Sequence, residues 1–332
     1  MARDVAWIMT RMEAMKSARA TTDSYWQQVA DYMLPSREFT RRSTPGGRRT
    51  AALIYNTSPI LALEQLAGAL HGMLTSPSLR WFALRPADDT LMANQAVGAW
   101  FETATDAMYN VFTDPKNGFD AASHEIYLDL VAFGTGCLYI PDGGRRGPRF
   151  QACAVSECYF AQAADGMIDT VYRRYPMPLR EAVNEWPDTL PEALKKKSNQ
   201  TPDEPVWIIH AVEPSDDRTQ WNETYVSEVG RAELSTARYK TFPFVPSRWS
   251  KRSGEVYGFG PGMNALPDVK LVNKLEEMSL RAVEKAVDPA IMMPDDGFLD
   301  TPTTRPGGIN YNRSCMPMVY NIAPMPTCAK PE

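Results

Sequence analysis

The order of apolar and polar residues divides the chain into a helical first part, a β-rich middle and a long amphipathic helix. In the first part, apolar residues recur at three- and four-residue spacing, as on the buried face of a helix. This spacing predicts helices over residues 3–33, from the cap-like Asn56-Thr57-Ser58 to about residue 74, over 91–112 and over 119–133. The second of these is so rich in leucine that we expect it to be mostly buried.

Short β-type runs and turn residues follow. WFALRP (81–86) and CLYI (137–140) have strand composition, and residues 149–177 form two β-rich halves around Asp165-Gly166, which predicts a hairpin. Residues 205–214 and 223–230 are further strand candidates in a small β module over 205–249, and two short helices, LREAVNEW and PEALKKKS, precede it. Together these elements predict an α+β fold that is mainly helical.

The stretch Phe244–Ile291 joins a β-like run, a glycine and proline cluster and the longest clean amphipathic pattern. After the breakers, which end at Pro267, Asp268 is the predicted N-cap of a helix that continues to Asp288. The predicted apolar face consists of Val272, Leu275, Ser279, Ala282, Val283 and Ala286. The predicted charged face consists of Lys270, Lys274, Glu277, Arg281, Glu284 and Lys285. The pattern alone favours an ordinary helix on a globular core with a solvated charged face.

Composition narrows the class of protein. The chain has 332 residues, 44% hydrophobic and 23% charged, which suggests roughly two lobes at about 150 residues per domain. Its net charge of −5 argues against a generally basic nucleic-acid binder. We expect no signal peptide and no membrane span, and we expect the five cysteines to be free thiols, because they are odd in number and lack a CxxC spacing.

The chain lacks the motifs of common enzymes. It contains no GxxxxGK[ST] sequence, no HExxH and no GxSxG elbow, and its three histidines (His71, His124 and His210) lie on separate predicted elements. Gly258, Gly260 and Gly262 do not keep the dinucleotide-binding spacing, so we interpret them as turn residues. We therefore expect no enzymatic activity, no cofactor and no metal.

Two GGRR sequences place guanidinium groups on predicted turns. Arg48, Arg49, Arg145 and Arg146, extended by Arg149, could contact phosphate. Because no aromatic residues for base stacking are interleaved with them, subunit pairing or solubility is the favoured interpretation.

In their order along the chain, several passages resemble the head-to-tail connector, or portal, proteins of short-tailed, T7-like bacteriophages. The passages are YWQQVADYMLPSR, NTSPILALEQLAGALHGMLTSPSLRWFAL, DLVAFGTGCLYI, RYKTFPFVPSRWSKRSGEVYGFGPGMNALPDVKLVNKL, and DPAIMMPDDG with PGGINYN. The resemblance covers nearly the whole chain, although members of the family normally continue beyond the last passage. The chain is therefore expected to be a C-terminally shortened version.

The resemblance implies a portal-type fold and a ring-forming subunit, usually dodecameric, at one capsid vertex, with double-stranded DNA passing through the ring. It implies major capsid and scaffolding proteins, a terminase, and tail or adaptor proteins as partners, and a place in the virion after synthesis in the host cytoplasm. It also implies that the helix after Pro267 is stem-like, with Lys270, Lys274, Arg281 and Lys285 as candidates to face the channel. The alternative is a virion structural adaptor that binds other structural proteins, or a truncated portal remnant, in either case without a ring that encloses DNA.

The resemblance also suggests a division into four parts. These are a helical wing-like part (1–136), a β-rich part with a clip-like module (137–250), a turn with the stem-like helix (251–291) and an irregular, proline-rich end (292–332).

Overall fold

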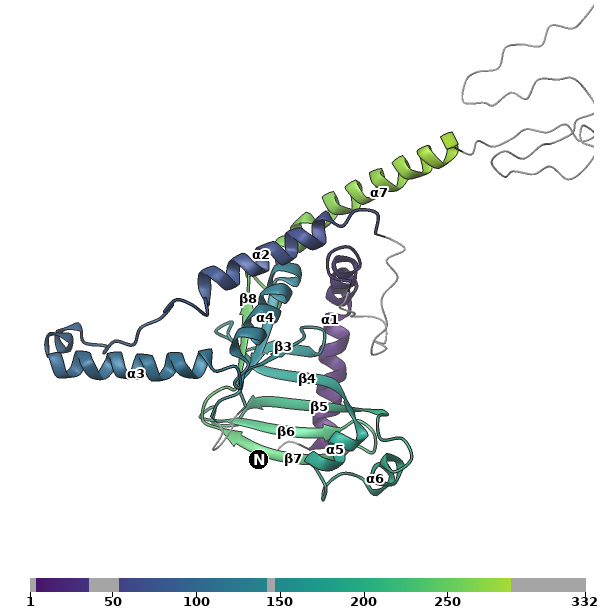
Figure 1. Ribbon diagram of the computed structural model, residues 1–332. Helices are drawn as coiled ribbons and strands as arrows, with labels where there is room; N and C mark the ends of the chain where they lie inside the picture. The colour runs from purple at the N-terminus through teal and green to yellow at the C-terminus, as the bar shows by residue number, and fades with distance from the viewer. Residues whose placement is uncertain (1–3, 36–53, 142–146, 288–332) are drawn as a thin grey trace, which may run out of the picture. The chain divides into compact units, whose positions relative to one another are not determined.

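The computed structural model describes residues 4–35, 54–141 and 147–287, which divide between a first unit ending at Val269 and a second beginning at Lys270. These residues form an α+β fold, as the sequence predicts (Figure 1). The helices are α1 (Val5–Met33), α2 (Ser58–Leu74), the 3-10 helix η2 (Asp89–Ala93), α3 (Gln95–Thr113), α4 (Phe119–Phe133), α5 (Leu179–Glu185), α6 (Glu192–Ser198) and α7 (Pro261–Val287). The strands are β1 (Thr135–Tyr139), β2 (Gln151–Cys153), β3 (Cys158–Gln162), β4 (Ile168–Pro178), β5 (Pro205–Pro214), β6 (Trp221–Ser227), β7 (Ala232–Tyr239) and β8 (Phe244–Arg248).

Two antiparallel sheets lie in the first unit. Strands β3 to β7 form a five-stranded meander in chain order, and β1 lies between β2 and β8 in a three-stranded sheet. The predicted hairpin is confirmed, since β3 and β4 are joined through Gly166, whose φ of 81° favours glycine. The three-stranded sheet joins segments that are far apart in the sequence, because β8 pairs with β1 and places Pro246 opposite Cys137.

Helix α1 and the pair α5/α6 cover opposite faces of the five-stranded sheet. Successive strand residues point to opposite faces, and on β5 Ile208 packs with the cluster under α5 and α6 whereas Ile209 packs with Ile8 and Met12 of α1. Figure 1 shows α1 running across these strands. The other end of α1 enters a separate core, where Trp26 meets Phe133 of α4. One long helix therefore fixes the sheet to the helical part of the unit.

Most predicted elements are found close to their expected bounds. Helix α4 begins and ends as predicted, and helices over 3–33 and in LREAVNEW and PEALKKKS are confirmed with small shifts at their ends. The predicted helix 91–112 divides into η2 and α3, because the Asn94 side chain accepts a hydrogen bond from Ala96 N and caps a new helix. Strand β6 begins two residues before the predicted 223.

The predicted strand 81–86 is wrong. The segment is not helical, but no strand pairs with it in the part of the chain that the structure describes. Its aromatic side chains instead pack beside α3 and α4, where Trp81 lies near Phe112 and Phe119. Its backbone is held by a side chain, since Leu84 N donates to Thr105 Oγ1 of α3 at 3.0 Å. Strand composition here reflects aromatic packing rather than a ladder of hydrogen bonds.

The expectation that α2 is mostly buried is also wrong for this chain by itself. Only Leu63 and Ala67 are buried, and they face α1 and α4, whereas Leu61 is 56% exposed and Met73 is 82% exposed. A helix that is apolar on all sides is normally enclosed. One chain covers only one stripe of α2.

Candidate functional site: the glycine cluster and helix α7

Glycines let the chain before α7 pass directly against the end of α4. A Cβ atom on Gly134 would collide with the backbone of Phe259 and Gly260, and one on Gly258 would collide with the carbonyl of Gly134. The contact is tied by hydrogen bonds, since Gly258 N donates to Thr135 Oγ1 and Trp249 N donates to Gly134 O, both at 2.9 Å. The cluster thus serves close backbone packing, in agreement with its interpretation as a turn.

Helix α7 begins at Pro261, not after Pro267 as predicted. Proline is favoured in the first turn of a helix, where its missing N–H is not needed, and Pro261 takes that place. Pro267 lies inside the helix, where it leaves the carbonyl of Met263 without its usual N–H donor. Tyr25 of α1 supplies the replacement, because its hydroxyl donates to Met263 O at 2.9 Å. This contact from a distant part of the sequence lets the helix continue through the proline.

In the second unit, the charged face of α7 is organised around Glu277. Its carboxylate lies 2.9 Å from Lys274 Nζ and 2.5 Å from Arg281 Nη2, which confirms the predicted Glu277–Arg281 pair. The hydrogen bond from Lys274, with the charge of Arg281, lowers the pKa of Glu277 below its usual value. Two of the four channel candidates therefore carry charges partly offset by one carboxylate. The other two, Lys270 and Lys285, lie one turn before Lys274 and one turn after Arg281.

Among residues 270–287, the described part of the second unit, nothing covers the apolar face of α7. Val272, Leu275 and Val283 are all exposed, as are Leu271, Met278 and Leu280 beside them. A solitary helix cannot bury its own apolar face, so the packing partner expected from the sequence is not among residues 270–287.

The structure describes only one of the five arginines in the two predicted clusters. Arg48, Arg49, Arg145 and Arg146 lie outside the described residues. Arg149 is exposed and lines a shallow depression with Asp114, Lys116 and Asn117. Their role in phosphate or subunit contact stays a prediction.

The structure also assembles polar groups that the sequence analysis missed. Arg19 of α1 is buried, and its guanidinium donates to the carbonyls of Val155, Ser156 and Cys158 and lies 2.8 Å from Asp23. Arg19 lies at helical spacing from the buried apolar residues of α1, which could have identified it as a buried position. The sequence gives no sign of the carbonyl groups that it meets there. These groups hold α1 on the turn before β3.

A second buried network joins the two sheets. His210 Nε2 lies 2.7 Å from Glu223 Oε1, and the Tyr139 hydroxyl donates to the same oxygen at 3.1 Å. Most polar groups of the two networks have partners within the chain, and both networks link separate elements of the fold. Within the described residues no group of three His, Cys, Asp or Glu side chains could hold a metal ion, and no helix there combines the length and apolarity needed to cross a bilayer. Cys137, Cys153 and Cys158 are free, as expected, and they are buried, whereas Cys315 and Cys328 lie outside the described residues.

Comparison with known proteins identifies the family. The model of the bacteriophage head to tail connecting protein family matches residues 6–325. This chain belongs to that family. It is 28% identical to the probable portal protein of Bordetella phage BPP-1 over 93% of this chain and 58% of that protein. It is 24% identical to the portal protein of Salmonella phage epsilon15 over 92% of this chain and 57% of that protein. The chain thus spans somewhat more than half the length of these relatives.

Proposed function

We propose that this chain is a portal subunit, which forms a ring at one capsid vertex through which viral double-stranded DNA is packaged and ejected. The observation that carries the proposal is the family match, which covers residues 6–325 and agrees with the names of both relatives. The exposed apolar faces of α2 and α7 support it, because a chain that assembles with copies of itself must carry surfaces that one copy leaves uncovered.

Helix α7 is the proposed DNA-facing element. Residues 270–287 contain four basic and three acidic side chains, and Glu277 engages Lys274 and Arg281. A weakly positive wall attracts a polyanion without holding it, which suits DNA that must slide without sequence recognition. Lys270, Lys274, Arg281 and Lys285 are the side chains proposed to face the channel.

The proposed partners follow from the same role. They are further copies of this chain, major capsid and scaffolding proteins, a terminase, and tail or adaptor proteins. Because the sequence has no P-loop motif, the terminase is the proposed source of the ATP-driven force, and this chain is proposed to be a structural protein of the virion without enzymatic activity. The four-part division at residues 136, 250 and 291 stays a prediction.

Negative-stain microscopy of the purified chain tests ring formation. Closed rings with a central hole are expected, with or without a capsid or scaffolding partner. Monomers or open arcs under both conditions would contradict the portal assignment and favour an adaptor that does not enclose DNA.

DNA packaging tests the role of α7. Reversing Lys274 and Arg281 to Glu adds two carboxylates beside Glu277 and should strongly impair packaging while ring formation continues. The matched control reverses the exposed Lys196 and Lys240, which changes the total charge equally but outside α7. Normal packaging by rings of the α7 variant would refute the channel assignment.

A further inference from the structure

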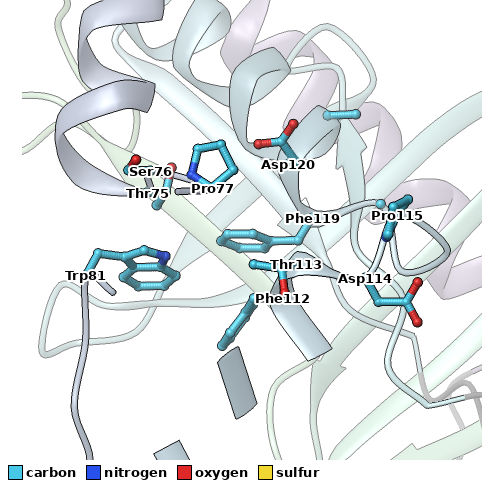
Figure 2. Close-up of a pocket in the computed structure, with 12 residues that line it drawn as sticks. Thr75, Ser76, Pro77, Trp81, Phe112, Thr113, Asp114, Pro115, Phe119 and Asp120 are labelled. Atoms are coloured by element: carbon cyan, nitrogen blue, oxygen red, sulfur yellow. The ribbon is translucent and has the colours of Figure 1, made fainter. Parts of the chain in front are cut away.

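A pocket of about 250 Å³ lies between the end of α2 and the start of α4. Pro77 and Trp81 line it from the segment after α2, Phe112 from the end of α3, and Phe119 and Asp120 from the first turn of α4. Figure 2 shows Trp81, Pro77 and Phe119 around one space, with the Asp120 carboxylate at its edge. No part of the function proposed above uses this pocket.

Flat aromatic rings form much of the wall. Trp81 is stacked with Phe119 at a centroid distance of 5.8 Å and an interplanar angle of 9°, and Phe112 lies 4.7 Å from Phe119. The neighbouring loop is held in place, since the Tyr109 hydroxyl donates to Pro77 O at 2.9 Å. Ring faces carry partial negative charge and attract cations. The wall is therefore suited to a cationic group with an apolar stem.

Two carboxylates add negative charge to this wall. The Asp120 side chain is 65% exposed, and its Oδ1 atom lies 2.8 Å from His71 Nε2. Asp114 Oδ1 accepts a hydrogen bond from Lys116 N. Among the described residues no hydrogen bond reaches the Oδ2 atom of either group. Asp114 also lines a second depression with the basic residues Lys116 and Arg149, so we expect Asp120 to contribute more to the binding of a cation.

We propose that this pocket binds an arginine side chain from a second copy of the chain. A guanidinium group is planar, stacks on aromatic rings and donates to a carboxylate through more than one N–H, whereas an ammonium group is a compact point charge. The acidic edge disfavours phosphate and other anions. The assignment to a second copy rests on the proposed ring. Met73, Leu74 and Leu79, close in sequence to residues that line the pocket, are exposed apolar side chains that such a contact could cover.

Titration of the chain with Nα-acetyl-arginine amide tests the pocket chemistry. The readout is the Trp81 indole N–H resonance, assigned from the signal that Trp81→Phe removes. The probe should shift this resonance, and the neutral analogue Nα-acetyl-citrulline amide should shift it far less. Asp120→Asn should weaken binding about two- to fivefold, as expected for a solvent-exposed ion pair, and Asp114→Asn should weaken it less.

The exposed Glu192→Gln on α6 is the matched control and should bind the probe like the wild type. Equal shifts with both probes, or unchanged affinity of Asp120→Asn, would overturn the assignment of a cation site.

Ring formation tests whether the bound arginine comes from a second copy of the chain. Asp120→Asn should require a higher protein concentration than the wild type to form rings, as measured by native mass spectrometry. Normal rings from this variant would overturn the assignment to a second copy. Probe binding by a wild-type chain that never forms rings would instead refute the portal function and leave the cation site standing. Rings without probe binding would refute the pocket and leave the function standing.

Discussion

The interior around α1 and the surface of α2 differ in which side chains they bury: a charged side chain is buried at α1, whereas apolar side chains are exposed at α2. At α1, a charged residue is enclosed and has partners within the chain, since the Arg19 guanidinium donates to three carbonyls and pairs with Asp23. At α2, leucine and methionine side chains stand exposed although nothing in their chemistry favours water. The first region is complete within one chain. The second becomes complete only when another surface covers it, so the contrast separates what folds the chain from what assembles it.

Removing the buried arginine should produce the largest effect. Arg19→Met leaves Asp23 and three carbonyl groups in the interior without their donor, so the free energy of unfolding should fall by about 3–5 kcal/mol. Burial already raises the pKa of Asp23, against the opposing effect of Arg19, so Asp23 should take up a proton more readily in the variant. Urea denaturation of the two proteins measures the loss. A change below about 1 kcal/mol would show that the junction is not important for stability.

Adding one methyl group at Gly134 should produce the next effect. Gly134→Ala puts a Cβ into the backbone of Phe259 and Gly260 and also strains a residue with φ of 73°. A loss of about 3 kcal/mol or more is expected in thermal or urea unfolding. Gly254→Ala is the control, because its φ of 84° is similar but its Cβ would meet open space, so it should cost only about 1–2 kcal/mol. Equal losses would disprove the close-packing role.

The comparison can be repeated within α2. Leu63→Ala empties a buried position and should cost about 2–4 kcal/mol. Leu61→Ala, two residues earlier on the exposed side, should change the stability of the isolated chain by less than about 0.5 kcal/mol but weaken ring assembly. Stability by urea denaturation and assembly by microscopy separate the two roles. Similar stability losses at both positions would show that α2 is enclosed by its own chain.

The smallest effect should be a pH-dependent one at Glu223. Burial raises its pKa, but hydrogen bonds involving His210, Tyr139 and Tyr239 outweigh burial and lower it overall. Such a carboxylate stabilises the fold above its unfolded pKa of about 4.3, and this contribution disappears as the pH falls through the lower folded value. Wild type should therefore exceed Glu223→Gln in stability at pH 6 and lose this advantage in acid, as followed by urea denaturation. A difference in the free energy of unfolding between the two proteins that does not change with pH would contradict this role of the Glu223 carboxylate.

Family membership was accessible from the sequence through the order of its passages, and local pattern was enough for several elements. Helix α4 has glycines on both sides and apolar spacing within it, and the β3–β4 hairpin turns at a residue that must be glycine. Such signals depend on only a few neighbouring residues, so they can be interpreted without knowledge of the fold. The aromatic pocket was not predictable, because Trp81, Phe112 and Phe119 meet only after α3 and α4 have packed.

The sequence by itself determined the α+β class, the amphipathic pattern of α7 and the Glu277–Arg281 pair, because propensity and helical spacing are local properties. Tertiary structure alone decided where α7 begins. Pro267 is a local signal to stop a helix, and only the hydroxyl of Tyr25, from the opposite end of the first unit's sequence, replaces the hydrogen bond that the proline removes. It also decided that 81–86 is no strand and that α2 lies exposed, because pairing and burial depend on partners that a local pattern does not specify.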